Sequence, residues 1–243
     1  MMARQIRSEW IKAMSLRSTW VIIGLSILGI IAQAVTALIQ GGSTPAAETR
    51  GVMSGSSYTL VLMVIIGAVA SAGEYSRKSI ITTYTTSSNR ARPILAKTLV
   101  VIAIALVIGA LSVPLSRLVA AIWYAAGSGT WDAGIGTAIH YAYGTMITYV
   151  GFAVLGVMIG LLCRSTAIAV GVAFGVLFII DPILAAVTTY SEYTATATAS
   201  TMLDPDTHQT AQPEFGAAIA LMVLYMVVLT GIALGVERRR DVA

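Results

Sequence analysis

The sequence predicts an all-α membrane protein in which six transmembrane helices follow an N-terminal amphipathic interfacial helix. Its 243 residues are 57% hydrophobic and only 11% charged, whereas a soluble domain carries about 25% charged residues. Apolar runs recur along the chain, and most come close to the roughly 20 residues that a helix needs to cross a hydrocarbon core about 30 Å thick. There is too little charge to cover a soluble surface, so lipid must cover much of this one.

The first segment, residues 1–18, has the pattern of an amphipathic helix. At about 100° per residue, Ile6, Trp10, Ala13 and Met14 share one face, and the opposite face is basic and polar. Because a tryptophan lies on the apolar side, the pattern favours a helix lying in the membrane interface. A disordered basic tail is the alternative.

Residues 19–243 form the transmembrane domain. The predicted spans cover, in order, about residues 19–39, 57–72, 94–114, 135–163, 166–187 and 215–236. Pro93 suits the start of the third span, because proline lacks only an N–H that would be unpaired there. This span either bends at Pro114 or ends near it and continues as an interfacial segment. Loops are expected at about residues 40–56 and 188–214.

The basic side chains predict the orientation of these spans. With six spans, all but two of the 15 Lys and Arg residues fall on the same side as the termini, and the exceptions are Arg50 and Arg117. By the positive-inside rule, both termini and residues 74–97 are cytoplasmic, and residues 188–214 are extracellular. The expected location is the plasma membrane.

No motif for an enzyme occurs in the sequence. The chain lacks a His-Glu-x-x-His metal motif, a Gly-x-Ser-x-Gly nucleophile elbow and a Gly-x-x-x-x-Gly-Lys-[Ser/Thr] phosphate loop. Its single cysteine, Cys163, excludes an intrachain disulfide and a cysteine-based metal cluster. We therefore expect no catalytic residue, no metal and no cofactor on this chain, and any ATP-driven function requires a second polypeptide.

Small residues one helical turn apart mark possible helix contacts. Such pairs let two helix backbones approach closely inside a membrane. They indicate packing within the chain or, alternatively, a contact with a second copy. Three Gly-x-x-x-Gly pairs occur in the predicted spans: Gly156/Gly160, Gly171/Gly175 and Gly231/Gly235.

One acidic residue stands inside a predicted span. Asp181 lies about 15 residues into the fifth span, where a charge is costly and suggests a pathway or gate residue. Because Pro182 follows it, Asp181 could instead mark an extracellular turn. Arg117 is predicted near the same level and is a possible partner. Met146, Tyr149 and Phe152 could line a pathway, although bulk packing explains them equally well.

Two stretches carry a resemblance to a known family. Residues 6–20 (IRSEWIKAMSLRSTW) and 73–97 (GEYSRKSIITTYTTSSNRARPILAK) resemble segments of the membrane subunits of ATP-binding-cassette (ABC) exporters of the type-2 permease class. The second stretch has the family's acidic residue at Glu74, a basic-x-basic element at 90–92 and a lysine at Lys97. The family more often has glycine where Lys78 stands.

The resemblance implies a cytoplasmic coupling helix between spans two and three, which docks in a groove of the ATPase. The docking candidates are Glu74, Arg77, Lys78, Ile80, Ile81 and Tyr84. The alternative is a solvated basic loop attracted to anionic lipid headgroups. The resemblance also implies short re-entrant helices within 188–214, although the stretch 194–201 (TATATAST) is less apolar than that pattern.

The function implied is that of a permease subunit exporting a drug, peptide, lipid or similar amphipathic cargo. ATP and Mg²⁺ would bind a separate ABC ATPase present in two copies, beside a second permease chain that is identical or similar, with the lipid bilayer around them and no nucleic acid. Two rivals remain. The first is an ion-coupled carrier, which would be expected to have several buried ionisable residues, whereas essentially one, Asp181, is found in the predicted spans. The second is a membrane scaffold or sensor, which would need no ATPase.

Overall fold

The computed structural model describes residues 2–41, 45–76, 91–127, 135–187, 193–205 and 213–239. Every regular element in these ranges is a helix. Six helical segments are long and apolar enough to cross a membrane, judged by length and composition. The predicted all-α class with six candidate spans is therefore confirmed, and the chain has the character of a multi-pass membrane protein.

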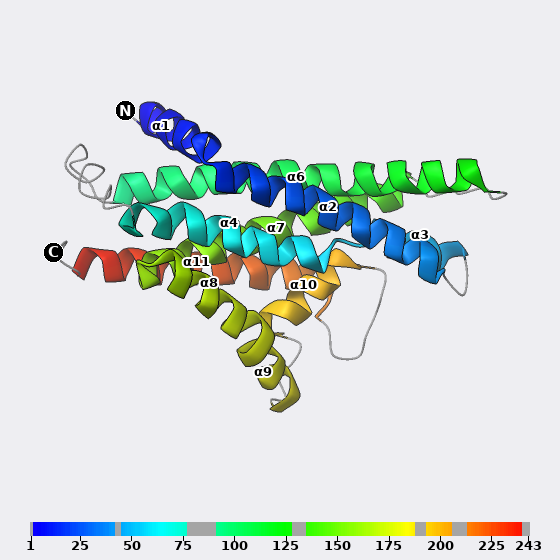
Figure 1. Cartoon of the computed structure of the whole chain (residues 1–243). Helices are drawn as coiled ribbons and strands as arrows, with labels where there is room; N and C mark the ends of the chain where they lie inside the picture. Colours follow the sequence, from blue (N-terminus) through cyan, green and yellow to red (C-terminus); the bar gives the residue numbers. More distant parts are fainter. Residues whose placement is uncertain are drawn as a thin grey trace.

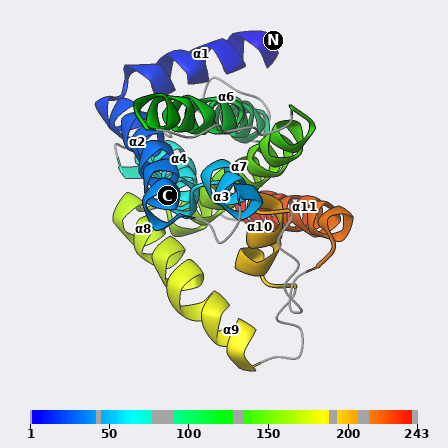
Figure 2. The ribbon, with the colours of Figure 1, turned by 90° about the vertical axis from the view of Figure 1, so that its right-hand side faces the viewer.

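Three helices form the centre of the molecule: α4 (Ser57–Ser76), α6 (Ala91–Ala126) and α7 (Ile135–Cys163). Between 56% and 61% of the most apolar window in each of these spans is buried inside the molecule. Their contacts form the largest core cluster, which contains the fully buried Met63, Val64, Tyr149 and Val157. In Figures 1 and 2, α4 and α7 lie between α6 on one side and α8 on the other.

The remaining spans lie at the periphery. They are α2 (Arg17–Gln40), α11 (Phe215–Arg239), and the fifth span, which is divided into α8 (Thr166–Gly175), the π-helix η1 (Val176–Ile180) and α9 (Asp181–Val187). The buried share of the apolar window falls to 28% in α2, 22% in the fifth span and 11% in α11. Their outer faces carry large apolar side chains, as expected where lipid is the solvent.

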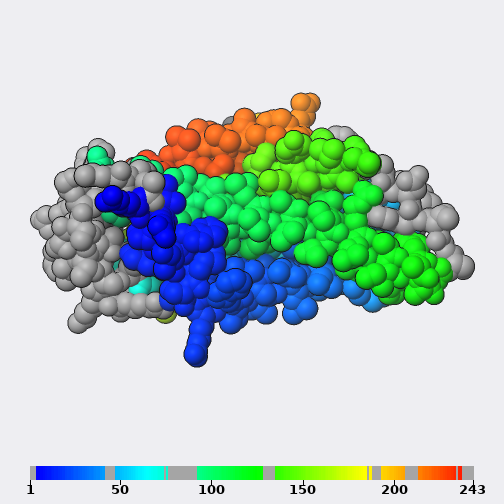
Figure 3. Space-filling view, turned by 90° about the horizontal axis from the view of Figure 1, so that it is seen from above, coloured from blue at the N-terminus to red at the C-terminus, as the bar shows by residue number. Residues whose placement is uncertain are grey.

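The N-terminal segment is the helix α1 (Met2–Ser15), which joins α2 at Leu16 and packs across α6. Figures 2 and 3 show α1 beside α6, with α2 running alongside. Ile6, Ala13 and Met14 lie on one face of α1 and pack against the core of this chain, whereas the pattern predicted that this face would meet the membrane interface. Trp10 does not share that environment, because 41% of its surface is exposed.

Two of the predicted loop regions contain helices, and one alternative for the third span is excluded. The region predicted as a loop at 40–56 contains α3 (Pro45–Met53), whose Val52 is fully buried in a cluster with side chains of α2 and α6. The region 188–214 contains α10 (Ala195–Leu203). Of the two alternatives for the third span, an end near Pro114 is wrong, because α6 continues through Pro114 to Ala126.

The antiparallel helices define two ends of the molecule. We call one the α1 end: it carries α1, the end of α4, the start of α6, the turn between α7 and α8, and the end of α11 (Figure 1). We call the other the α10 end: it carries α3, α9, α10 and the start of α11 (Figure 1).

Candidate functional site

Most of the predicted coupling segment lies outside the described residues. This applies to Arg77, Lys78, Ile80, Ile81 and Tyr84, and for Glu74 only the helical backbone within α4 is described. The docking face therefore stays a prediction. What the structure places is the pair of helix ends that this segment joins: α4 ends at Ser76 and α6 begins at Ala91, both at the α1 end.

The turn between α7 and α8 contacts the helix that leads into this segment. Arg164 has a positive φ of 53°, a backbone conformation that favours glycine. From there its guanidinium carbon lies 5.3 Å from the centre of the Tyr75 ring, close enough for a cation–π attraction. Tyr75 is the residue before Ser76, so this turn and the end of α4 are joined. The short hinge at 164–165 is the only sequence signal for this contact.

Charge is divided between the two ends. Among the described residues, nine basic positions lie at the α1 end: Arg4, Arg7, Lys12, Arg17, Arg92, Lys97, Arg164, Arg238 and Arg239. Four acidic positions lie toward the α10 end: Glu48, Asp181, Asp204 and Glu214. The described exceptions are three acidic positions at the α1 end, Glu9, Glu74 and Glu237, and the basic Arg50 and Arg117. The structure therefore keeps the charge asymmetry that the sequence predicts.

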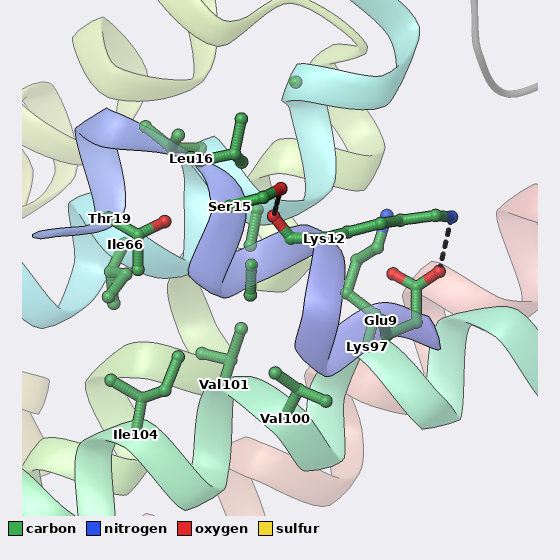
Figure 4. A pocket seen from close by; sticks show the side chains of 14 residues that line it. Glu9, Lys12, Ser15, Leu16, Thr19, Ile66, Lys97, Val100, Val101 and Ile104 are labelled. Atoms are coloured by element: carbon green, nitrogen blue, oxygen red, sulfur yellow. Dashed lines mark hydrogen bonds and ion pairs between the residues drawn. The ribbon is translucent and has the colours of Figure 1, made fainter. Parts of the chain in front are cut away.

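A pocket lies at the α1 end, between α1 and the two helices that flank residues 77–90. Its volume is about 320 Å³, and α1, α2, α4 and α6 contribute its walls. The walls are mainly aliphatic, with Ile66 and Val69 on α4 and Val100, Val101 and Ile104 on α6 (Figure 4). Pockets that bind small molecules typically measure about 300–1,000 Å³ and are predominantly apolar, so this one is at the small end of that range.

Charged side chains stand at the α1 side of this pocket. Lys12 donates to the Glu9 carboxylate at 2.7 Å, within one turn of α1. Glu9 and Lys97 are each only 7% exposed, and Figure 4 shows Lys97 extending from α6 toward α1. The pocket thus has an apolar body with two lysines and one glutamate at one end. Lys97 belongs to the stretch that resembles type-2 permeases. Nothing in the sequence near Glu9 indicates that Glu9 would lie close to Lys97.

At the α10 end, Asp181 binds the N-terminus of α10. Its carboxylate accepts hydrogen bonds from the backbone N–H groups of Ala195 (3.2 Å) and Thr196 (3.1 Å), and from the Thr196 hydroxyl. Thr194 adds an ordinary cap by accepting from the N–H of Ala197. Asp181 is 6% exposed, and these donors, together with the partial positive charge of a helix N-terminus, offset the cost of burying it.

This arrangement favours a structural role for Asp181, but the predicted turn at this residue is wrong, because the helix continues through Asp181 and Pro182 to Val187. It also separates Asp181 from the partner suggested for it, because Arg117 is on α6 and α9 lies on the opposite side of the bundle (Figures 1 and 2). The structure does not bring the two residues together. Whether either contacts a transported molecule remains a prediction.

Helix α10 packs against α7 and against the segment between α3 and α4 by close contacts. A side chain at Gly144 would overlap the carbonyl oxygen of Met202. The N–H of Gly55 donates to the carbonyl oxygen of Leu203 at 3.1 Å, and the Tyr141 hydroxyl donates to Asp204 at 2.8 Å. These contacts hold both ends of α10 against the bundle once Asp181 has fixed its start.

The three glycine pairs have different surroundings. A side chain at Gly156 would overlap the carbonyl oxygen of Val64, and one at Gly160 would overlap the hydroxyl of Ser71, so this pair packs against α4. The other two pairs behave differently, because a Cβ there would meet nothing within 4 Å: Gly171, Gly175, Gly231 and Gly235. Packing within the chain accounts for the first pair only.

The suggested pathway residues on α7 belong to the core of this chain. Tyr149 is fully buried, donates to the carbonyl oxygen of Ser56 (3.3 Å) and accepts from the Ser56 N–H (3.0 Å). Phe152 is 1% exposed. Met146 packs against Gly109 of α6, where an added Cβ would lie 2.8 Å from the Met146 Cα. Packing is therefore the role that these contacts support.

In the part of the chain that the structure describes, no group of three or more His, Cys, Asp or Glu side chains could hold a metal ion. No protein-family model matches the chain, and no curated protein matches it at a significant level.

Proposed function

We propose that this chain is the membrane permease subunit of an ABC exporter, which moves an amphipathic cargo such as a drug, peptide or lipid out of the cell. Two copies of a separate ATPase supply the energy and bind ATP and Mg²⁺. A second permease chain, identical or similar, completes the pathway. The α1 end faces the cytoplasm in this proposal, α1 lies in the inner interface, and the chain itself catalyses no reaction.

One observation carries the proposal: the connection between α4 and α6 joins two neighbouring central helices at the basic end of the molecule. Residues 77–90 include Arg77, Lys78 and Arg90, and Arg92 follows in the first turn of α6. A motor that binds this connection acts directly on the two helices that it joins. The resemblance of the same stretch to the coupling segment of type-2 permeases supports this assignment.

The structure offers a route by which such a force could spread. A displacement at the end of α4 would move Tyr75. Because Arg164 contacts the Tyr75 ring, it would also move the turn at which α8 begins. It also reaches α7, because α4 and α7 pack along their length with glycines at the contact. We infer that α4 and α7 move as one body while α8 and α9, which bury far less surface, move relative to them.

The proposal is tested by purifying the tagged chain from its native membranes and identifying the proteins that accompany it. A stoichiometric subunit that carries a nucleotide-binding motif, with ATP hydrolysis that rises when the two are reconstituted together, is expected. Reproducible absence of such a subunit would favour a scaffold or sensor.

A double variant tests the docking face. Arg77→Glu with Tyr84→Ala should abolish ATPase binding and stimulation while the permease stays folded. The matched control, Arg50→Glu with Tyr58→Ala, makes the same changes at the α10 end, where Tyr58 is 65% exposed. A fully assembled and stimulated complex containing the first variant would contradict docking at this face.

A further inference from the structure

The pocket beneath α1 lies along the direction in which a bilayer changes from polar to apolar. Its charged residues, Glu9, Lys12 and Lys97, stand at the α1 side. Its apolar wall extends along α6 from Val100 to Ile104. Since α6 advances 1.5 Å per residue, Ile104 lies about 10 Å further along the helix than Lys97. A molecule that fills this pocket therefore meets charge at one end and mainly aliphatic side chains, with the Thr19 hydroxyl, at the other.

The charges favour an anionic group at the polar end. Two lysines and one glutamate line the pocket, so the lining side chains include one more basic than acidic group, and Lys12 contacts Glu9. Lys97 reaches α1 from the apolar wall of α6, and a lysine with its stem along an apolar surface places its ammonium where a phosphate or carboxylate can bind. The Ser15 hydroxyl lies near Lys12 and donates to its carbonyl oxygen at 2.8 Å, and Thr19 lines the pocket farther away, beside Ile66 (Figure 4).

The surroundings place this pocket at the edge of a bilayer. Trp10 and Ile11 on α1 and Trp20 on α2 are 41%, 58% and 59% exposed, although all three are large and apolar. Tryptophans are enriched where the headgroups meet the hydrocarbon. The charged end of the pocket would then lie at the level of the headgroups, and its apolar walls at the level of the first acyl carbons.

We propose that the pocket beneath α1 binds one acyl chain of an anionic phospholipid, with the phosphate held by Lys97 and Lys12. The volume of about 320 Å³ suits part of one chain and not a whole lipid. The bound lipid fastens α1 to α4 and α6, next to the connection between these two helices. This inference does not depend on an ATPase partner, because it concerns only the described residues of this chain.

The test is binding of defined lipids to the full chain, purified in a non-ionic detergent and measured by native mass spectrometry. The probes are palmitoyl-oleoyl phosphatidylglycerol and palmitoyl-oleoyl phosphatidylcholine, which have the same chains and differ in net charge. The wild-type chain should bind phosphatidylglycerol at least about five-fold more tightly, because one basic contact near the surface contributes about that factor. Equal binding of the two lipids would overturn the proposal.

Two substitutions locate the binding. Lys97→Met should remove most of the preference for phosphatidylglycerol, whereas Arg7→Met removes an exposed charge from α1 outside the pocket and should preserve it. Gly73→Leu should fill the pocket and weaken binding of both lipids, because Gly73 lines it and an added Cβ meets nothing within 4 Å. Gly24→Leu is the control, since Gly24 is equally open and lies outside the pocket.

If Lys97→Met fails to fold, Lys97→Arg should retain the preference, and Gly73→Leu still decides whether the pocket is the site. Indistinguishable lipid binding by Gly73→Leu and Gly24→Leu would assign the lipid to the outer surface and overturn the proposal. Oleate serves as a single-chain competitor. Suppose that equimolar oleate displaces phosphatidylglycerol from the wild-type chain but not from Lys97→Met or Gly73→Leu. The pocket would then be a site for single-chain amphiphiles, and the assignment to a phospholipid would be overturned.

Discussion

The contact between α4 and α7 and the outer faces of α8 and α11 carry the same sequence motif in opposite environments. At Gly156 and Gly160, α7 approaches α4 so closely that no side chain fits. At Gly171 and Gly231, on α8 and α11, an added Cβ meets nothing within 4 Å. A Gly-x-x-x-Gly pair thus permits close approach without specifying the partner. The open pairs remain available to lipid or to a second permease chain.

The difference divides the molecule into a rigid centre and a loosely attached periphery. Within the periphery, α2 is also attached to the start of α4 by polar contacts, since the Thr59 hydroxyl donates to the carbonyl oxygen of Ser26 at 3.0 Å and the Ser56 hydroxyl donates to that of Gly29 at 3.1 Å. Hydrogen bonds between membrane helices contribute about 0.6–2 kcal/mol each. Because the closest helix contacts lie in the centre, equivalent substitutions should lower the stability strongly at the contact of α4 with α7 and only slightly on the outer faces of α8 and α11.

The largest effect is expected for Gly156→Leu. The new side chain would overlap the backbone of Val64, which cannot move without separating α4 from α7. We expect destabilisation by more than about 3 kcal/mol or loss of folded protein, measured by thermal unfolding in detergent. Gly171→Leu makes the same change at the periphery and should shift stability by less than about 0.5 kcal/mol. Equal effects of the two substitutions would remove the distinction between centre and periphery.

An intermediate effect is expected for Asp181→Ala, at the point where the periphery is attached by α10. Removing the carboxylate leaves the N–H groups of Ala195 and Thr196 without their acceptor, which should cost about 1–2 kcal/mol. Hydrogen exchange should accelerate across residues 195–203. Asp181→Asn keeps one oxygen acceptor and should lose less.

The same pair of variants separates a structural from a transport role for Asp181. If Asp181→Asn abolished export while exchange across 195–203 stayed slow, the acid would belong to the pathway. Export that follows the protection of α10 in both variants would support the capping role.

The smallest effect is expected for Tyr149→Phe. The substitution removes a hydroxyl that joins α7 to Ser56 at the start of α4 and leaves the ring in place, so a loss of about 1 kcal/mol is expected. Tyr143→Phe is the matched control on the same helix, because Tyr143 is 60% exposed. Urea or thermal titration of both variants measures the difference, and a larger effect at Tyr143 would contradict the assignment of the centre.

Long apolar runs made the six spans predictable, because the length of a spanning helix is set by the bilayer and is visible in the sequence alone. Local rules failed where a distant residue completes an element. Helix α10 forms in a threonine-rich stretch because Asp181, 14 residues before Ala195, binds its first N–H groups. Helix α3 was missed because its stability comes from Val52 packing on α2 and α6.

The candidate sites differ in the same way. The burial of Asp181 was predictable from its place in a span. Its role was not, because the resemblance implied short helices within 188–214 but nothing in the sequence indicated that Asp181 would bind the start of one. The pocket beneath α1 was not predictable, because it exists only when α1 crosses α6 and brings Glu9 toward Lys97. The only hint in the sequence was Lys97, a charged residue that follows the apolar residues 94–96 at the start of a predicted span.

The proposed function depends most directly on the side of the membrane that residues 77–90 occupy. Single cysteines at Ser87→Cys and, as the opposite control, Thr207→Cys can be introduced into a Cys163→Ser chain and labelled with a membrane-impermeant maleimide. The account predicts that Ser87→Cys reacts only in inside-out vesicles and Thr207→Cys only in intact cells. Labelling of Ser87→Cys from outside intact cells would place the basic end away from any cytoplasmic ATPase and contradict the account.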